Sequence, residues 1–196
     1  VGAADFRRLK SKITVTTADG LPVITGFNTV LDVEERTESG QAVTIAAVHG
    51  HCVGAGVLLA AACDLRVATE STRWAIPEVD IGIPLAWGGI PRLVREIGPA
   101  ATRELVLTCR PFTSHEVHSL GMLNEVVDDD ALEAHVDRLA EQLSTKSSYT
   151  LRATLRAVDT AVEAMVSTGG AWTDADAFLV AINDPESRDM ATRYLS

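Results

Sequence analysis

The stretch GHCVGAG at residues 50–56, followed directly by VLLAAACD at 57–64, decides how this chain should fold. It predicts a tight turn of small residues that opens onto a strongly apolar helix. The preceding segment AVTIAAV, residues 42–48, has the continuous apolar pattern of a buried strand. A helix that begins without bulky side chains leaves backbone N–H groups uncovered, and these can bind an anion or a developing oxyanion. The unit is typical of ligand sites in α/β proteins, although glycines at such a turn also serve close packing alone.

Further motifs follow this helix in a fixed order. They are DLRVA (64–68), WAIPEVDIGIP (74–84), WGGIPRL (87–93), RELVLT (103–108) and GMLNEVV (121–127). In this order and at these spacings the chain resembles the crotonase superfamily, the enoyl-CoA hydratase/isomerase family, most densely over residues 41–127. Several linked motifs are far more specific than any one of them. The resemblance implies an α/β fold, a crotonase-like spiral of β-β-α units with a helical C-terminal region.

The composition indicates a globular protein and disfavours several classes of partner. The chain has 196 residues, 46% of them hydrophobic, and can bury a full core. A net charge of −10 disfavours nucleic acid and anionic membranes as partners, even though residues 7–12, RRLKSK, form a basic patch. The longest apolar run, around residues 57–63, is far shorter than a membrane span. We expect neither a membrane span nor a secretory leader.

The cysteines indicate a reducing environment. There are three, at positions 52, 63 and 109, and no two of them form a CxxC pair. This spacing predicts free thiols, two of them acting as small hydrophobic residues, in a cytoplasmic protein. The histidines show no metal spacing such as HExxH, so we expect no metal site.

We expect the α/β core to span residues 1–128 and a helical C-terminal trimerisation region to span residues 129–196. Turn signals at Asp19-Gly20 and Ser39-Gly40 enclose a mixed segment that is helix, loop or partly mobile. Residues 41–98 alternate short apolar runs with helical stretches, as repeated β-α units do. Capping signals predict a short helix that begins at Thr113–Glu116 and ends at Gly121, and a last helix from Asp184-Pro185. A strand is expected between them at Leu123–Val127.

Two apolar stripes indicate amphipathic helices beyond residue 128. The first consists of Leu132, Val136, Leu139 and Leu143, and the second of Leu151, Leu155, Val158 and Val162. Such stripes belong more often to the core of their own chain than to a cofactor site. The resemblance implies that some of them pack against neighbouring subunits, in a homotrimer or a hexamer.

The resemblance also implies the chemistry, which is stabilisation of a thioester enolate. A coenzyme A thioester is then the substrate, with no covalently bound cofactor, and two backbone N–H groups hold its carbonyl oxygen while a carboxylate moves a proton. By motif, the second donor falls on Ala55, which follows Gly54 in the turn. The first donor falls on Ala4, because GAADF at residues 2–6 is similar to the family's AGAD motif. Arg7 stands where many members carry a basic residue near the coenzyme A phosphates.

The chain departs from the family's hydratases at one of two catalytic glutamates. Those enzymes use both to hold and activate a water molecule. Here the first position is Leu58, and the second is Glu78 in IPEV at residues 76–79. One carboxylate beside an oxyanion hole can still move a proton between two carbons, so a single-glutamate enoyl-CoA isomerase is favoured over a hydratase. The alternatives for Glu78 are a surface or ion-paired carboxylate, with Asp80 as the fallback acid.

The loop LAWGG at residues 85–89 is a second departure. Trp87 and Gly88 are candidates to bind the acyl group together with Gly54 and Leu58. The indole either lines the acyl pocket or packs between layers, which is the commoner place for a tryptophan. The family's members usually carry further strands and a helix before the AGAD motif. Because this sequence begins almost at that motif, we expect either a fragment of a longer protein or a natural short form that lacks those elements.

Histidines flank the oxyanion turn at His49 and His51, and either can in principle act as an acid or base. A structural or surface role is commoner for such residues. The alternatives to isomerase or hydratase activity are a catalytically degenerate acyl-CoA-binding homologue, RNA binding, or another crotonase-fold reaction such as thioester hydrolysis or decarboxylation. Acyl chain length and pathway do not follow from the sequence.

Overall fold

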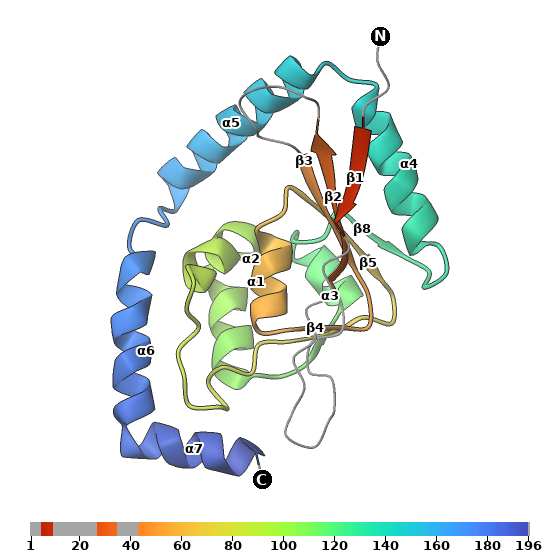
Figure 1. Ribbon diagram of the computed structural model, residues 1–196. Helices are drawn as coiled ribbons and strands as arrows, with labels where there is room; N and C mark the ends of the chain where they lie inside the picture. The colour runs from red at the N-terminus through yellow and green to blue at the C-terminus, as the bar shows by residue number, and fades with distance from the viewer. Residues whose placement is uncertain (1–4, 10–26, 35–42, 196) are drawn as a thin grey trace.

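The computed structural model describes residues 5–9, 27–34 and 43–195, and the side chains of residues 43–194. Strands and helices alternate along most of this region, and helices alone form its C-terminal end (Figure 1). The strands are β1 Asp5–Leu9, β2 Phe27–Glu34, β3 Val43–Val48, β4 His51–Val53, β5 Leu65–Thr69, β6 Arg73–Ala75, β7 Phe112–Thr113 and β8 Glu125–Val127. The helices are α1 Ala55–Ala61, α2 Gly89–Thr108, α3 Ser114–Ser119, α4 Leu132–Ser144, α5 Ser148–Met165, the 3₁₀ helix η1 Ala171–Thr173, α6 Asp174–Asn183 and α7 Pro185–Leu195.

The described strands form two separate sheets. One has the order β1-β2-β3-β5-β8 and the other the order β4-β6-β7. β3 pairs in parallel with β5, with Ile45 opposite Leu65, and β4 pairs in parallel with β6, with Cys52 opposite Trp74. In two successive units the paired strands go to different sheets and a helix follows them: β3-β4-α1 and then β5-β6-α2. This repeated β-β-α unit confirms the predicted α/β class.

A buried tryptophan fixes the smaller sheet. Trp74 on β6 is fully buried, and its Nε1–H donates to Ser114 Oγ at 3.0 Å. Ser114 Oγ in turn donates to Thr69 O at 2.7 Å. The indole also stacks on Phe112, with ring centroids 6.3 Å apart. A large aromatic side chain with its N–H satisfied thus ties β6 to β5, β7 and α3.

A buried arginine explains two of the sequence motifs. Arg66 on β5 donates from Nε to Met122 O at 2.6 Å, from Nη1 to Cys63 O at 2.7 Å, and from Nη2 to Glu96 Oε2 at 2.8 Å. Its backbone N–H donates to Asn124 Oδ1 at 2.7 Å, and its carbonyl accepts from Asn124 N–H at 2.9 Å. Through Arg66 and Asn124, the DLRVA and GMLNEVV motifs therefore connect β5 to the end of α1 and to α2.

Helix α4 contributes to the core as its stripe predicted. Val136 and Ala140 form a buried cluster with Ile45 of β3 and Val67 of β5. In Figure 1, α4 lies beside the larger sheet. This helix therefore belongs physically to the packed α/β body.

Helix α5 corrects the expectation that its stripe is core. None of its 18 residues is buried. Figure 1 shows why: α5, α6 and α7 leave the sheet and follow one another in an arc past α1 and α2. The segment touches the body at particular points, for example where Arg95 Nε donates to Val166 O at 2.7 Å. At another, a Cβ added to Gly82 would lie 2.2 Å from Ser187 O of α7, which only glycine allows.

Strand β2 corrects the expectation of a helix or loop in the mixed segment before residue 39. It pairs antiparallel with β3, with Val30 opposite Ala46. Its sequence alternates Phe27, Thr29, Leu31 and Val33 with mostly polar residues, a period of two that is typical of a strand. The predicted strand from Leu123 is shorter than expected and begins at Glu125.

The predicted caps and the cysteine pattern are confirmed. Thr113 Oγ1 accepts Glu116 N–H at 3.2 Å at the start of α3, and Asp184 Oδ2 accepts Ser187 N–H at 2.9 Å at the start of α7. All three cysteines are free, and Cys52 and Cys109 are buried. Within residues 5–9, 27–34 and 43–195, no helix has both the length and the apolar character that a membrane span needs.

Candidate active site

The helix begins at Ala55 directly after the glycine turn, as the sequence predicted, but the stretch 50–56 that was expected to be a turn also contains the short strand β4, His51–Val53. Gly54 has φ 53° and ψ −117°, a backbone conformation that residues with a side chain rarely adopt. Its N–H donates to Ala75 O at 2.9 Å, and its carbonyl accepts Val57 N–H at 2.9 Å. Ala55 is the first residue of α1, so its N–H precedes the first intrahelical hydrogen bond. This N–H is the donor that the sequence predicted for an oxyanion.

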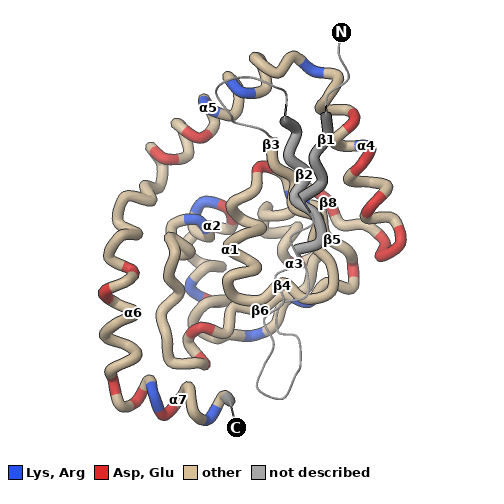
Figure 2. The backbone as a smooth tube through the Cα atoms, viewed as in Figure 1, with Lys and Arg blue, Asp and Glu red and all other residues tan. Residues whose placement is uncertain are grey.

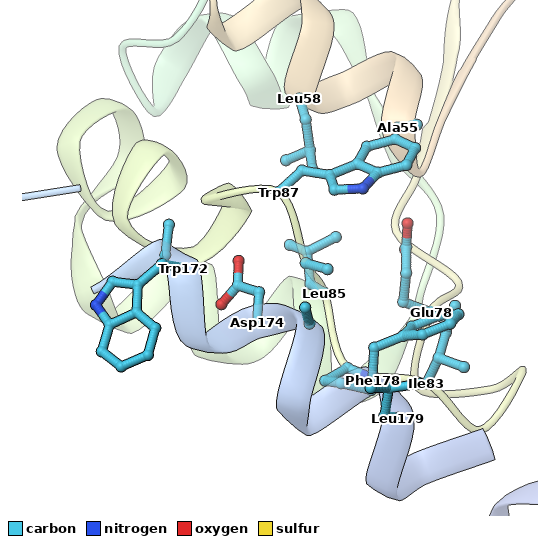
Figure 3. Close-up of a pocket in the computed structure, with 14 residues that line it drawn as sticks. Ala55, Leu58, Glu78, Ile83, Leu85, Trp87, Trp172, Asp174, Phe178 and Leu179 are labelled. Atoms are coloured by element: carbon cyan, nitrogen blue, oxygen red, sulfur yellow. The ribbon is translucent and has the colours of Figure 1, made fainter. Parts of the chain in front are cut away.

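A pocket of about 710 Å³ includes the start of α1 (Figure 3). Its lining comes from α1, from the chain between β6 and α2, and from η1 with α6. The lining residues are Ala55, Leu58, Glu78, Ile83, Pro84, Leu85, Ala86, Trp87, Ala171, Trp172, Asp174, Ala175, Phe178 and Leu179. Apart from two carboxylates, these side chains are hydrocarbon or aromatic. The structure thus brings the predicted residues Ala55, Leu58, Glu78 and Trp87 to one pocket.

The Glu78 carboxyl group projects into this pocket toward the start of α1 (Figure 3). A turn holds its backbone, because Ile83 N–H donates to Glu78 O at 2.9 Å. Its Oε2 is buried and has no hydrogen-bond partner among the described residues. Burial raises the pKa of Glu78, and a hydrogen bond to its own backbone N–H opposes this. A partly buried carboxyl group of raised pKa in a cleft is typical of a general acid or base, and no cation pairs with Glu78 among the described residues.

Gly54 lies directly against this carboxyl group. A Cβ added to Gly54 would lie 2.6 Å from Glu78 Oε1. The glycine therefore has two reasons to be a glycine: its positive φ and the closeness of Glu78. The oxyanion turn and the carboxylate are held in contact.

Leu58 occupies the place where the resemblance put the first glutamate of hydratases. It is 6% exposed and lines the pocket. A Cβ added to Gly89 would lie 2.8 Å from Leu58 Cδ1, so the leucine is packed against the start of α2. This part of the pocket wall is hydrocarbon.

Of the two places open to Trp87, the structure gives it the one in the pocket lining. It lines the pocket while 75% of its surface is exposed. Its φ is 59°, in the left-handed region that bulky residues rarely adopt. Such outliers cluster at functional sites. Gly88, the N-cap of α2, is not itself in the lining, and its N–H donates to Asp174 Oδ2 at 2.8 Å.

The remaining acid and base candidates lie elsewhere. His49, His51 and Asp80 do not line the pocket, and His51 and Asp80 are exposed. No group of His, Cys, Asp and Glu within the described ranges has a metal-binding arrangement.

Two predicted site residues remain predictions. Ala4, the expected first oxyanion donor, lies outside the described residues. Arg7 lies in β1, but its side chain is not described, so its expected place near coenzyme A phosphates is untested.

The pocket wall from η1 and α6 was not predicted. Its members lie far along the sequence from the motifs at residues 50–127: they are Trp172, Asp174, Phe178 and Leu179. The only signal was the apolar run AFLVAI at residues 177–182, which is too short and too weakly amphipathic to indicate its partner.

The chain is similar to known proteins over most of its length. The model of the enoyl-CoA hydratase/isomerase family matches residues 26–195. A short-chain-enoyl-CoA hydratase of Clostridioides difficile is 35% identical over 127 residues, which cover 65% of this chain and 81% of the relative. A peroxisomal Delta(3,5)-Delta(2,4)-dienoyl-CoA isomerase of Arabidopsis thaliana is 34% identical over 154 residues, 76% of this chain and 55% of the relative. Hydratases and an isomerase thus match at similar identity.

The fold is similar to that of solved enoyl-CoA hydratases. One from Mycobacterium avium superposes with a TM-score of 0.67 at 26% identity, covering 78% of this chain and 67% of that structure. The matched region often falls short of the whole relative: this chain spans 41%, 58% and 61% of three further curated hydratases.

Proposed function

Because this chain belongs to the enoyl-CoA hydratase/isomerase family, we propose that it binds an acyl-CoA thioester and moves a proton on the bound acyl chain. Glu78 is the acid and base, and the Ala55 N–H is a donor to the thioester oxygen. The reaction is isomerisation of an enoyl-CoA double bond rather than hydration. The coenzyme A thioester is the substrate, and the proposal needs no bound cofactor or metal.

The proposed reaction uses one carboxyl group twice. The Glu78 carboxylate removes a proton from C2 of a 3-enoyl thioester, and the electron pair of the C2–H bond moves into an enolate. The enolate oxygen accepts a hydrogen bond from Ala55 N–H, a kind of contact whose loss typically costs about 10²–10³ in rate. The Glu78 carboxyl group then returns the proton to C4, and the double bond now joins C2 and C3. No atom is gained or lost.

One observation carries the choice of isomerisation: a buried leucine, Leu58, lines the same pocket as Glu78. Hydration in this family needs a second carboxylate at that position to hold the attacking water. A hydrocarbon side chain cannot accept or donate a hydrogen bond. Proton transfer between carbons needs no ordered water and is compatible with this wall.

The test is product analysis with purified protein and matched 3-enoyl-CoA and 2-enoyl-CoA thioesters. We expect the 3-enoyl substrate to become the 2-enoyl product, with no 3-hydroxyacyl product from the 2-enoyl substrate. Hydration would contradict the isomerase proposal. Release of free coenzyme A or carbon dioxide would favour hydrolysis or decarboxylation, and tight binding without turnover would favour a degenerate homologue.

The proposed role of Glu78 predicts a shifted pH profile. Burial raises the pKa of this group above its reference value of 4.5. Since only the carboxylate accepts the proton from C2, the rate should rise with pH along an acid limb centred above that value. The dependence of kcat/KM on pH measures the free enzyme. An acid limb centred at or below 4.5 would contradict the assignment.

We also propose that the helical region 129–196 takes part in homo-oligomer contacts, as a trimer or hexamer. Helix α5 carries no buried residue, and its Tyr149 and Val158 are 75% and 52% exposed. Exposed apolar side chains grouped on one element often mark an interface. Light scattering on the purified protein should give a mass of three or six chains. A monomeric mass at micromolar concentration would contradict this proposal.

A further inference from the structure

Asp174 brings a second carboxylate into the pocket from the C-terminal segment. It is the first residue of α6, and its Oδ2 accepts the Gly88 N–H at 2.8 Å. Gly88 caps the N-terminus of α2, where backbone N–H groups and the helix dipole favour a negative charge. Figure 3 shows the Asp174 carboxyl group among the residues that line the pocket. The acid is therefore held in place.

Among the residues that the structure describes, the pocket lining offers no cationic side chain to balance this charge. Among its described lining residues, the only polar side chains besides the Trp87 and Trp172 indoles are Glu78 and Asp174, and none is Lys, Arg or His. The wall around them is apolar and includes Leu85 and Phe178. A carboxylate at the far end of an acyl chain would lose water on entering this wall and would face like charges. Both effects oppose binding.

We infer that Asp174 is a specificity-determining residue, which makes the pocket select uncharged acyl chains and reject acyl chains that end in a carboxylate. This inference rests on the proposed acyl-CoA function and adds the class of acyl group. In this proposal Glu78 faces the reacting carbons of the acyl group. Asp174 comes from the C-terminal segment of the protein and repels a charge at the distal end of the acyl group. An uncharged acyl chain carries no charge for Asp174 to repel, and it packs against the apolar wall.

The test is a binding experiment that needs no turnover. Calorimetric titration of the full chain compares hexanoyl-CoA with adipoyl-CoA, which has the same number of carbons and a terminal carboxylate. Octanoyl-CoA and suberoyl-CoA repeat the comparison at greater length, and free coenzyme A is the reference. We expect each dicarboxylic thioester to bind at least about tenfold more weakly than its monocarboxylic partner.

Two matched variants assign the effect to Asp174. Asp174→Asn keeps an oxygen to accept the Gly88 N–H but removes the charge, and it should reduce the discrimination at least about threefold. Asp176→Asn changes the same charge in the first turn of the same helix, outside the pocket lining, and should leave the ratio unchanged. Figure 2 shows the acidic positions at this end of α6.

The outcomes distinguish a failure of this inference from a failure of the proposed acyl-CoA function on which it rests. Equal affinity for hexanoyl-CoA and adipoyl-CoA, or an unchanged ratio in Asp174→Asn, would overturn the role of Asp174 while leaving acyl-CoA binding intact. Binding of hexanoyl-CoA no tighter than that of free coenzyme A would instead overturn the proposed function itself.

Discussion

The Glu78→Gln variant is expected to lose about 10²- to 10⁴-fold in kcat for the conversion of a 3-enoyl to a 2-enoyl thioester, the usual contribution of a general acid or base. Glutamine has nearly the same size and shape, but it neither accepts nor returns a proton. The carboxyl group projects into the pocket, and its buried Oε2 has no hydrogen-bond partner among the described residues. No described residue therefore holds the proton of that oxygen through a hydrogen bond. Stopped assays with separation of the two thioesters measure the loss.

The stability of the same variant separates a catalytic defect from misfolding. Burial raises the pKa of Glu78 in the folded state above that in the unfolded chain. The neutral form is therefore favoured by folding, and stability is lost as the pH rises through the folded pKa. Glutamine removes that loss, so Glu78→Gln should be at least as stable as the unmodified chain at neutral pH. Urea unfolding followed by tryptophan fluorescence measures this.

A neighbouring acid provides the matched control. Asp80 is exposed and does not line the pocket, so Asp80→Asn should keep its activity. Full activity in Glu78→Gln together with a loss in Asp80→Asn would move the acid/base role to Asp80.

The Gly54→Ala variant is expected to lower kcat about 100-fold, because displacement of a catalytic group by about 1 Å typically costs that much. Its new methyl group would meet Glu78 Oε1 at 2.6 Å, so the carboxyl group must move. The substitution should also destabilise the fold by about 1–3 kcal/mol, since alanine is strained at the sparsely populated φ of 53° and ψ of −117° that this turn requires. Steady-state kinetics and urea unfolding measure the two effects separately.

Gly170 is the matched control for that variant. Its φ is −83°, and a Cβ added there would meet nothing within 4 Å. We expect Gly170→Ala to leave kcat and stability unchanged. If Gly54→Ala retained the full kcat, the close approach of Gly54 to Glu78 would have no catalytic consequence.

Much of the candidate site was predictable because its parts lie in short motifs. The strand, turn and helix around Gly54 follow from apolar periodicity and from small residues at the turn. Glu78 and Leu58 could be placed because the motifs keep a fixed order. The chemical role of these residues stays a prediction, and so does that of Ala4.

Other features depend on which surfaces meet. The stripe on α5 has helical spacing, but periodicity does not tell whether a helix lies against its own chain. Trp87 is large and apolar, and composition alone favours a buried place that the structure does not give it. The strand β2 shows that an alternating pattern can be missed even over eight residues.

The sequence by itself determined the family, the α/β class, and the turn that presents the Ala55 N–H, because each depends on residues close together along the chain. Only the tertiary structure decided that the pocket receives a second wall from η1 and α6, with Asp174 bound to Gly88 across 86 positions. Contacts between residues so far apart arise from the packing of the whole chain, for which local patterns carry no signal.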